Sequence, residues 1–263
     1  MFENKIVWIT GASSGIGEAL AIEFAKLKSK LILSARRENE LIRVQNNCKT
    51  FTSEVEILPF DLTSVDFISI SQKAISIFGT IDILINNGGI SQRSSASETP
   101  IEIDRKIMEL NYFSNIALTK AVLPQMIKNN NGRIVVMSSL SGKYGWKQRS
   151  AYSASKFALH GFYESLQAEL SNTNIHVMIV CPGRVKTNIS FNALKADGTK
   201  HNKMDVAQEK GIPADVCAGK IIAGLKSNKK ELMIAGKEKL LLMIRRVIPS
   251  LYYNIAAKRD PNV

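Results

Sequence analysis

The chain has 263 residues, 45% of them hydrophobic, which suits one α/β domain with a full core better than two small domains. Its three cysteines are odd in number and far apart, and no Cys/His spacing is typical of a metal site, so we expect neither a disulfide framework nor a bound metal. The formal net charge is +12, and we see no signal peptide and no apolar run long enough to cross a bilayer, so we expect a cytoplasmic protein.

Short runs of β-branched and aliphatic residues alternate with helical patterns along the chain. Most of these runs are nearly continuous in apolar residues, as expected of strands buried on both faces of a parallel sheet. The alternation predicts an α/β fold, namely a Rossmann-like, doubly wound parallel sheet of about seven strands with helices on both faces. The expected strands are residues 6–10, 31–35, 55–60, 81–86, 133–138, 176–181 and 231–235.

A glycine-rich turn, Thr10-Gly-Ala-Ser-Ser-Gly-Ile-Gly17, follows the first expected strand and opens the first expected helix. Such a turn lets the backbone approach a pyrophosphate, and the helix N-terminus offers free N–H groups. The spacing is G-x-x-x-G-x-G, which differs from the common G-x-G-x-x-G dinucleotide fingerprint. A glycine-rich turn without a ligand is the alternative, but the strand before it and the helix after it favour a coenzyme. The predicted contacts are Gly11, Ser13, Ser14, Gly15, Ile16 and Gly17.

The second expected strand ends at Ala35, where a dinucleotide fold usually places an acid on the ribose hydroxyls. Arg36 and Arg37 follow, and a guanidinium suits a 2′-phosphate because it can form two parallel charge-assisted hydrogen bonds. We therefore expect NADP(H) rather than NAD(H), although both arginines could also be solvated loop charges.

Tyr152 and Lys156 stand four residues apart in a segment of small, helix-compatible residues. Side chains at this spacing share one helix face, about 5–6 Å apart between Cβ atoms. A cation there favours the phenolate, which otherwise forms near pH ~10, so the tyrosine could donate and accept protons. Taken alone, the pair is equally typical of an ordinary surface helix.

Five features taken together resemble the single-domain branch of the short-chain dehydrogenase/reductase family. The resemblance covers residues 5–190 and extends to the strand expected at 231–235. The features are the glycine turn, Asn86-Asn-Gly-Gly89 after the fourth strand, Ser139 thirteen residues before Tyr152, Tyr152-x-x-x-Lys156, and Pro182-Gly183 after the sixth strand.

The resemblance implies a role for each residue of a catalytic set. Tyr152 would be the acid/base, Lys156 would lower the pKa of the tyrosine and hold the nicotinamide ribose, and Ser139 would bond the substrate oxygen. Asn111 resembles the asparagine that supports a proton relay through water, and only the spacing selects Ser139 over Ser138. The resemblance also implies coenzyme contacts from Tyr152 and Lys156 and from Asp61, Leu62, Asn87, Gly88, Pro182, Gly183, Val185 and Thr187, with Asp61 near the adenine and Thr187 near the carboxamide.

Two positions depart from the family pattern. Gly88 stands where the family usually has alanine, which gives that turn more conformational freedom. Ser14 stands where NADP-preferring members often carry a basic residue, so the coenzyme preference depends on Arg36 and Arg37. Residues 86–93 look most similar to a subgroup of membrane-associated reductases that act on lipophilic carbonyls.

The predicted function is therefore an NADP(H)-dependent oxidoreductase that interconverts a carbonyl and an alcohol. The alternative is a non-catalytic NADP(H)-binding sensor or scaffold of the same fold. Nucleic-acid binding is not expected, because no basic helix carries base-stacking aromatics. Residues 92–97, 140–149 and 184–212 should line the substrate site. Tyr144, Trp146 and Phe191 favour a bulky apolar substrate, whereas Lys143, Lys147, Gln148 and Arg149 favour an anionic one; all could equally be loop surface.

We treat residues 1–263 as one dinucleotide-binding domain with a substrate loop at 184–212 and a basic amphipathic extension at 237–263. Nine Lys/Arg and two Glu lie between Lys226 and Arg259. The extension could cover the cleft or a partner subunit, could contact a membrane surface peripherally, or could simply be a solvated basic face. The resemblance further implies a homodimer or homotetramer paired through helices at 103–128 and 151–170.

Overall fold

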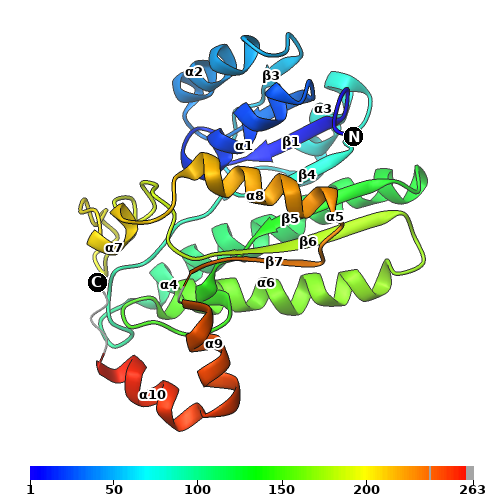
Figure 1. Cartoon of the computed structure of the whole chain (residues 1–263). Coiled ribbons are helices and arrows are strands. Elements are labelled where there is room, and N and C mark those ends of the chain that lie inside the picture. The colour runs from blue at the N-terminus through cyan, green and yellow to red at the C-terminus, as the bar shows by residue number, and fades with distance from the viewer. Residues whose placement is uncertain (237, 259–263) are drawn as a thin grey trace.

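A seven-stranded parallel sheet forms the centre of the computed structural model, which describes residues 1–236 and 238–258 (Figure 1). The strand order is β3-β2-β1-β4-β5-β6-β7, and it reverses direction between β1 and β4. This arrangement confirms the doubly wound fold predicted from the alternating pattern. The strands are β1 Ile6–Thr10, β2 Lys30–Ser34, β3 Val55–Ile57, β4 Ile83–Asn86, β5 Gly132–Met137, β6 Ile175–Pro182 and β7 Glu231–Ile234.

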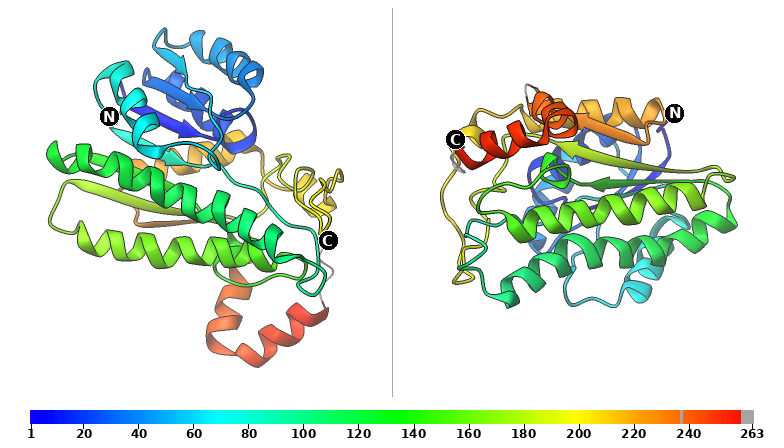
Figure 2. Two further views of the ribbon diagram at one scale, coloured as in Figure 1. Left: turned by 180° about the vertical axis from the view of Figure 1, so that it is seen from behind. Right: turned by 90° about the horizontal axis from the view of Figure 1, so that it is seen from below.

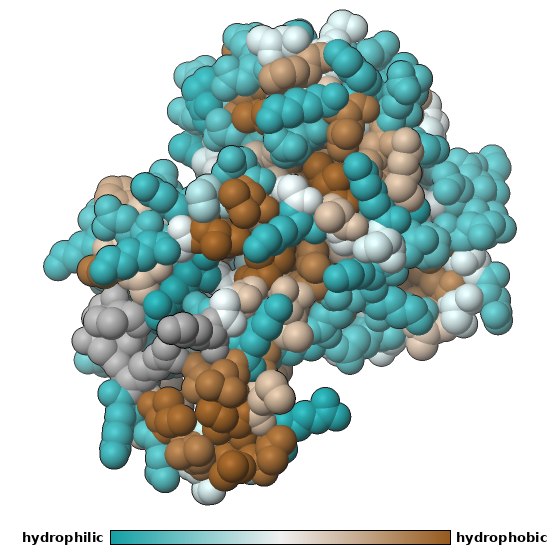
Figure 3. All heavy atoms as spheres, viewed as in Figure 1, coloured by the Kyte–Doolittle hydropathy of each residue, from teal (hydrophilic) through white to brown (hydrophobic). Residues whose placement is uncertain are grey.

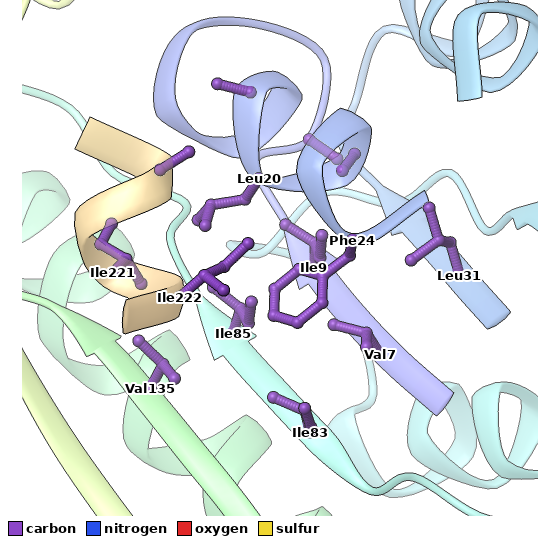
Figure 4. Close-up of a cluster of buried hydrophobic side chains, with 14 of the residues drawn as sticks. Val7, Ile9, Leu20, Phe24, Leu31, Ile83, Ile85, Val135, Ile221 and Ile222 are labelled. Atoms are coloured by element: carbon purple, nitrogen blue, oxygen red, sulfur yellow. The ribbon is translucent and has the colours of Figure 1, made fainter. Parts of the chain in front are cut away.

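Helices cover both faces of the sheet (Figure 2). On one face lie α1 Gly15–Lys26, α2 Glu38–Lys49 and α8 Ala214–Lys226; on the other lie α3 Phe67–Phe78, α5 Ser114–Lys128 and α6 Ser150–Glu169. Successive strand residues supply the two cores alternately, because side chains along a strand point to opposite faces. Val7 and Ile9 pack toward α1 and α8, as Figure 4 shows, whereas Trp8 belongs to the core beneath α3, α5 and α6.

The helix expected at 103–128 is interrupted by one wider turn. It comprises α4 Ile101–Met108, a π-helical turn η1 Glu109–Phe113, and α5. Ser114 Oγ donates to the carbonyl of Leu110 at 2.6 Å, and Asn115 Nδ2 donates to the carbonyl of Asn111 at 2.8 Å. These side chains stabilise the turn by binding carbonyls within it, and π-turns of this kind occur frequently at functional sites. The sequence pattern did not predict this interruption.

The segment 184–212 is largely irregular, as expected, but it contains one helical turn, α7 Val206–Glu209. Its two ends pair with each other through Val185 and Ile212, and Leu194 in its middle pairs with Gln92. The first bridge closes the segment into a loop, and the second holds its middle against the segment after β4. Helix α8 begins directly after Pro213.

The C-terminal region forms two helices rather than one, α9 Glu238–Val247 and α10 Pro249–Lys258, which extend away from the sheet (Figure 1). Pro249 opens the second helix, where proline is well tolerated. Tyr252 anchors the pair: it is buried, and its hydroxyl donates to the Gly145 carbonyl at 3.1 Å. Position 237 and positions 259–263 of the expected extension lie outside the described residues. No helix among residues 1–236 and 238–258 is long and apolar enough to cross a membrane.

Candidate active site

The carboxyl ends of the central strands open into one cavity of about 630 Å³. Parallel strands present these ends at the same edge, and ligands of such sheets bind where the strand order reverses. Of the predicted site residues, Gly17 and Asn111 do not line this cavity. Those that do are Gly11, Ser13, Ser14, Gly15, Ile16, Arg36, Arg37, Asp61, Leu62, Asn87, Gly88, Ser139, Tyr152, Lys156, Pro182, Gly183, Val185 and Thr187.

The glycine turn needs glycine for two different reasons. Gly11 and Gly15 have φ angles of +64° and +59°, a region that other residues rarely adopt. Gly17 is required for packing, because a Cβ atom there would lie 2.3 Å from the backbone oxygen of Gly11. Ser14 precedes α1 and makes no side-chain capping bond, so its hydroxyl does not cover the first N–H groups of the helix.

Thr10 and Asn87 join this turn to the end of β4. Thr10 Oγ accepts hydrogen bonds from the backbone N–H groups of Asn87 and Gly88 at 3.0 and 3.1 Å. Asn87 Nδ2 donates to the carbonyls of Thr10 and Gly11 at 3.0 and 3.2 Å. A Cβ atom on Gly88 would lie 2.4 Å from Leu62 Cδ1, so the glycine found in place of the usual alanine gives room to Leu62.

Arg36, Arg37 and Asp61 surround the end of β2. Arg37 Nη2 donates to Ser13 Oγ at 3.2 Å, and Arg36 Nη1 lies 3.7 Å from Asp61 Oδ2. Burial raises the pKa of Asp61, but hydrogen bonds from Thr63 and the nearby Arg36 guanidinium outweigh it, so the net shift is downward. The side chain of Arg36 is 66% exposed, which leaves its ion pair open to solvent.

Tyr152, Lys156 and Ser139 meet at the other end of the cavity. Tyr152 and Lys156 share one face of α6, with Lys156 Nζ 5.8 Å from the centre of the tyrosine ring. Ser139 immediately precedes the 3₁₀ turn η2 Leu140–Gly142; its hydroxyl accepts from the backbone N–H of Ser141 at 3.1 Å and acts to lower the pKa of the neighbouring Tyr152. Ser138 instead donates to the Lys156 carbonyl at 3.2 Å and contacts His160. Ser138 thus has partners of its own, whereas Ser139 lies beside Tyr152; the catalytic role of Ser139 stays a prediction.

The expected lowering of the Tyr152 pKa by Lys156 is not found. Burial raises the pKa of Tyr152, and the neighbouring Ser139 hydroxyl together with the guanidiniums of Arg149 and Arg93 opposes the shift without overcoming it. Lys156 Nζ donates to the Met137 carbonyl at 2.7 Å and lies beside the tyrosine ring. Burial lowers the pKa of Lys156 itself to about 8. The cations that act on the Tyr152 hydroxyl are therefore two arginines.

A model of the short chain dehydrogenase family matches residues 5–197. The chain belongs to the short-chain dehydrogenase/reductase family. It is 40% identical to a Drosophila melanogaster "dehydrogenase/reductase SDR family protein 7-like", over 97% of this chain and 80% of the relative. It is 39% identical to a Xenopus laevis "dehydrogenase/reductase SDR family member 7B", over 98% of this chain and 82% of the relative.

Solved structures agree with this fold. A Burkholderia phymatum short-chain dehydrogenase/reductase, determined in complex with NAD, superposes with a TM-score of 0.85 at 21% identity and covers 100% of this chain and 98% of its own. A Streptomyces avermitilis short-chain dehydrogenase superposes with a TM-score of 0.81 at 26% identity, over 98% and 100% of the two chains. The first likeness shows the fold alone.

Asn111 of this short-chain dehydrogenase/reductase is fully buried in the π-helical turn. Its Oδ1 accepts from the Ile90 backbone N–H at 2.9 Å, and its Nδ2 donates to the Ile90 carbonyl at 2.9 Å and to Ser155 Oγ at 3.0 Å. A Cβ atom on Gly89 would lie 3.0 Å from Asn111 Oδ1 and 3.6 Å from Lys156 Nζ. Asn111 therefore fixes the loop after β4 against α6, directly behind the glycine that separates it from the cavity.

A buried group of three charged residues, which sequence reasoning missed, also lines the cavity. Arg93 contacts both carboxylate oxygens of Asp205, and Arg149 Nη2 lies 3.1 Å from Asp205 Oδ2. The Arg93 and Asp205 side chains are 4% and 6% exposed. Two guanidiniums share one carboxylate, so this triad keeps a formal excess of one positive charge beside Tyr152. Its members come from three different loops, so no local sequence pattern predicts that they meet.

Only some residues of the loops expected to line the substrate site do line the cavity. Tyr144, Trp146 and Arg149 line the cavity. Four others, namely Phe191, Lys143, Lys147 and Gln148, do not, so those four predictions are wrong. Phe191 is 42% exposed, and Lys143 reaches away to Glu231 at 2.8 Å. Gln92 is fully buried, and its Oε1 accepts from the backbone N–H groups of Ala151 and Tyr152, which fixes the start of α6.

Proposed function

We propose that this protein is an NADP(H)-dependent oxidoreductase that interconverts a carbonyl and an alcohol by hydride transfer, with Tyr152 as the acid/base. The observation that carries the proposal is the pair of Tyr152 and Ser139, which lines the same cavity as Lys156 and the glycine turn. Two hydroxyls at one point can hold a substrate oxygen from two directions. Because the chain belongs to a dehydrogenase/reductase family, we assign this pair to the interconversion of a carbonyl and an alcohol.

The residues of the cavity fit a dinucleotide. The glycine turn and the uncapped start of α1 would hold the pyrophosphate, and Asp61 and Leu62 would contact the adenine. Lys156 would hold the nicotinamide ribose, and Pro182, Gly183, Val185 and Thr187 would surround the nicotinamide. When bound, the coenzyme supplies or accepts the hydride. Arg36 and Arg37, both in the cavity wall, support a preference for the extra phosphate of NADP(H).

The reaction asks the chain's own residues to polarise the substrate oxygen and to move one proton. The Tyr152 hydroxyl donates its proton to the oxygen in reduction, and the Tyr152 phenolate accepts it in oxidation, while Ser139 stabilises the charge that develops there. Burial disfavours the phenolate form of Tyr152, and the guanidiniums of Arg149 and Arg93 offset part of that cost. A proton relay through water beside Asn111 belongs to this proposal as well.

The cavity walls favour a bulky substrate with an apolar part. Tyr144 and Trp146 pack edge to face with their rings 5.2 Å apart and form an apolar wall with Leu140. The opposite observation is the excess positive charge of Arg93 and Arg149 against Asp205, which favours an anionic group on the substrate. A lipophilic carbonyl is therefore the first candidate, and an amphiphilic carbonyl with an anionic group is the second.

Replacing Tyr152 with Phe tests the mechanism. We expect Tyr152→Phe to lose about 10²–10⁴-fold in kcat with NADPH and a broad carbonyl panel, while NADPH still binds. The matched control is Tyr163→Phe on the same helix, which removes a hydroxyl bonded to Thr119 and Asn115. That control should lower stability while the wild-type rate persists. Turnover retained by Tyr152→Phe would refute the acid/base role.

A non-catalytic sensor or scaffold is the competing function. It requires the same coenzyme site but no carbonyl turnover, so tight NADPH binding without oxidation of NADPH by any of ketosteroids, retinal, quinones, sugars or 3-oxoacyl thioesters would favour it. The complete set of Asn111, Ser139, Tyr152 and Lys156 favours the enzyme. Cytoplasmic localisation, a single domain over the whole chain, and a homodimer or homotetramer stay predictions.

We also propose peripheral membrane contact through the α9–α10 hairpin. Hydrophobic side chains gather on this hairpin in Figure 3, and Leu240, Met243 and Val247, which share one face of α9, are 60%, 65% and 73% exposed. Lys239, Arg245 and Arg246 lie on the same helix, a combination typical of interfacial helices.

Replacing the three apolar residues with serine should reduce co-sedimentation with anionic liposomes. Ile68→Ser, at a 66% exposed position on α3, is the control; equal binding by both variants and wild type would exclude the contact.

A further inference from the structure

His160 on α6 has an unusual environment for a buried histidine. Only 7% of the residue is exposed, yet its ring nitrogen Nδ1 has no hydrogen-bond partner among the described residues. Glu164 Oε1 lies 3.4 Å from this nitrogen, but not in a direction that forms a hydrogen bond. Glu231, at the start of β7, completes a group in which one ligand atom from each residue lies within 4.8 Å of the others.

The hydrogen bonds of Ser138 assign the state of the His160 ring. Ser138 Oγ donates its one hydrogen to the Lys156 carbonyl at 3.2 Å and lies 3.0 Å from His160 Nε2. In this arrangement it accepts from the ring, which puts the hydrogen on Nε2 and leaves Nδ1 a bare lone pair; Cys181 Sγ lies 3.6 Å from the same Nε2. That lone pair and Glu164 Oε1, 3.4 Å away, are both acceptors. A cation between them would satisfy both.

The distance between His160 Nδ1 and Glu164 Oε1 suits a tetrahedral ion. Zinc binds histidine nitrogen at about 2.0–2.1 Å and carboxylate oxygen at about 2.0–2.2 Å, which places neighbouring tetrahedral ligands about 3.4 Å apart. The distance from His160 Nδ1 to Glu164 Oε1 is 3.4 Å. The two residues stand at positions i and i+4 of one helix, the spacing that puts side chains on one face. Ser138 supplies the contact to the second ring nitrogen that orients metal-binding histidines in general.

The charges of the cluster also favour a cation. Glu164 and Glu231 carry two negative charges, and Lys143, whose Nζ lies 2.8 Å from Glu231 Oε2, balances one of them. The side chains of Lys143 and Glu231 are 24% and 35% exposed, so the lysine can turn toward solvent when the carboxylate takes another partner. An imidazole among the ligands selects a transition metal over Mg²⁺ or Ca²⁺.

We propose that His160, Glu164 and Glu231 form a binding site for a divalent transition-metal ion of the Zn²⁺ type, with water in the fourth position. The ion would tie α6 to the edge strand β7. It would also stiffen the segment of α6 that carries Lys156, because Ser138 bonds both the His160 ring and the Lys156 carbonyl. The site lies outside the substrate chemistry proposed above.

Metal titration of the full-length protein tests this site. After treatment with EDTA, the protein should bind one equivalent of Zn²⁺ by calorimetry, and Co²⁺ should give the visible absorption of a tetrahedral site. Glu164→Gln and Glu231→Gln should each weaken the affinity by at least about tenfold, the lower end of the loss seen even for residues that only orient a ligand. Glu169→Gln, the same change at another exposed position of α6, should bind like wild type.

Two results would overturn the proposal. One is equal Zn²⁺ affinity in wild type, Glu164→Gln and Glu231→Gln, or no saturable binding at all. The other is a ¹⁵N spectrum in which His160 Nδ1 carries a hydrogen in the EDTA-treated protein and does not respond to Zn²⁺. Glu164 is exposed, so its variant should fold, and its thermal unfolding in EDTA should match that of wild type.

Discussion

The two ends of the cavity are built in different ways. At the end lined by the glycine turn, the wall is formed by a turn of eight consecutive residues, Thr10–Gly17. Hydrogen bonds between Thr10 and Asn87 link this turn to the end of β4. At the Tyr152 end, the walls depend on side chains that meet across long stretches of chain, such as Arg93 and Asp205, which are 112 positions apart. The first end is a local motif on a rigid strand. The second depends on packing of the whole fold and is built largely from loops, where binding residues concentrate.

Removing the Asp205 carboxylate should produce the largest effect on stability. Asp205→Asn leaves two buried guanidiniums opposite a neutral amide, and breaking a buried ion pair in this way costs about 3–5 kcal/mol of unfolding free energy. Urea unfolding measures that loss, and limited proteolysis should show cleavage within 184–212. Asp197→Asn, in the same loop but fully solvated beside Lys195, should unfold like wild type. Equal midpoints for the two variants would mean that the triad does not hold the loop.

Lys156 offers a test of how burial of a charged group affects stability at the Tyr152 end of the cavity. Its pKa in the fold is about 8, below the ordinary 10.5, so between these values the unfolded chain binds more protons than the folded one. The destabilisation due to Lys156 is therefore full below pH 8 and is relieved as the pH rises toward 10.5. The free energy of unfolding of wild type relative to Lys156→Met should rise by about 2 kcal/mol between pH 7 and pH 10.

The same pair of measurements on Lys49→Met gives the control, because Lys49 is an exposed lysine on α2. Wild type relative to Lys49→Met should show no comparable rise. A flat difference for Lys156→Met as well would mean that the ammonium is better solvated or better bonded in the fold than its burial and its contact with Met137 indicate.

The sequence predicted the local features of the molecule better than the long-range ones. The seven strands and the glycine turn follow from continuous apolar runs and from the positions of glycine, which depend on neighbouring residues only. The π-helical turn around Asn111 was not predicted, because its wider winding is stabilised by side chains such as Ser114 and Asn115 that read as ordinary helix residues. The sign of the Tyr152 pKa shift was also missed, because spacing shows that Lys156 is near but not how deeply the phenol is buried.

The coenzyme preference is the smallest predicted effect. It tests whether residues close together in the sequence at the glycine-turn end determine which coenzyme binds. Arg37 is held by Ser13, so its guanidinium is positioned before any ligand arrives. If it binds the 2′-phosphate, Arg37→Ala should raise KM for NADPH about tenfold, at the low end for a charge-assisted bond, and leave KM for NADH unchanged. Arg43→Ala removes an arginine that pairs with Glu18 and Glu40 on the outside of the fold, and it should change neither constant. A wild-type preference for NADH, or an equal loss with both coenzymes, would show that the arginines at the end of β2 serve the turn rather than the phosphate.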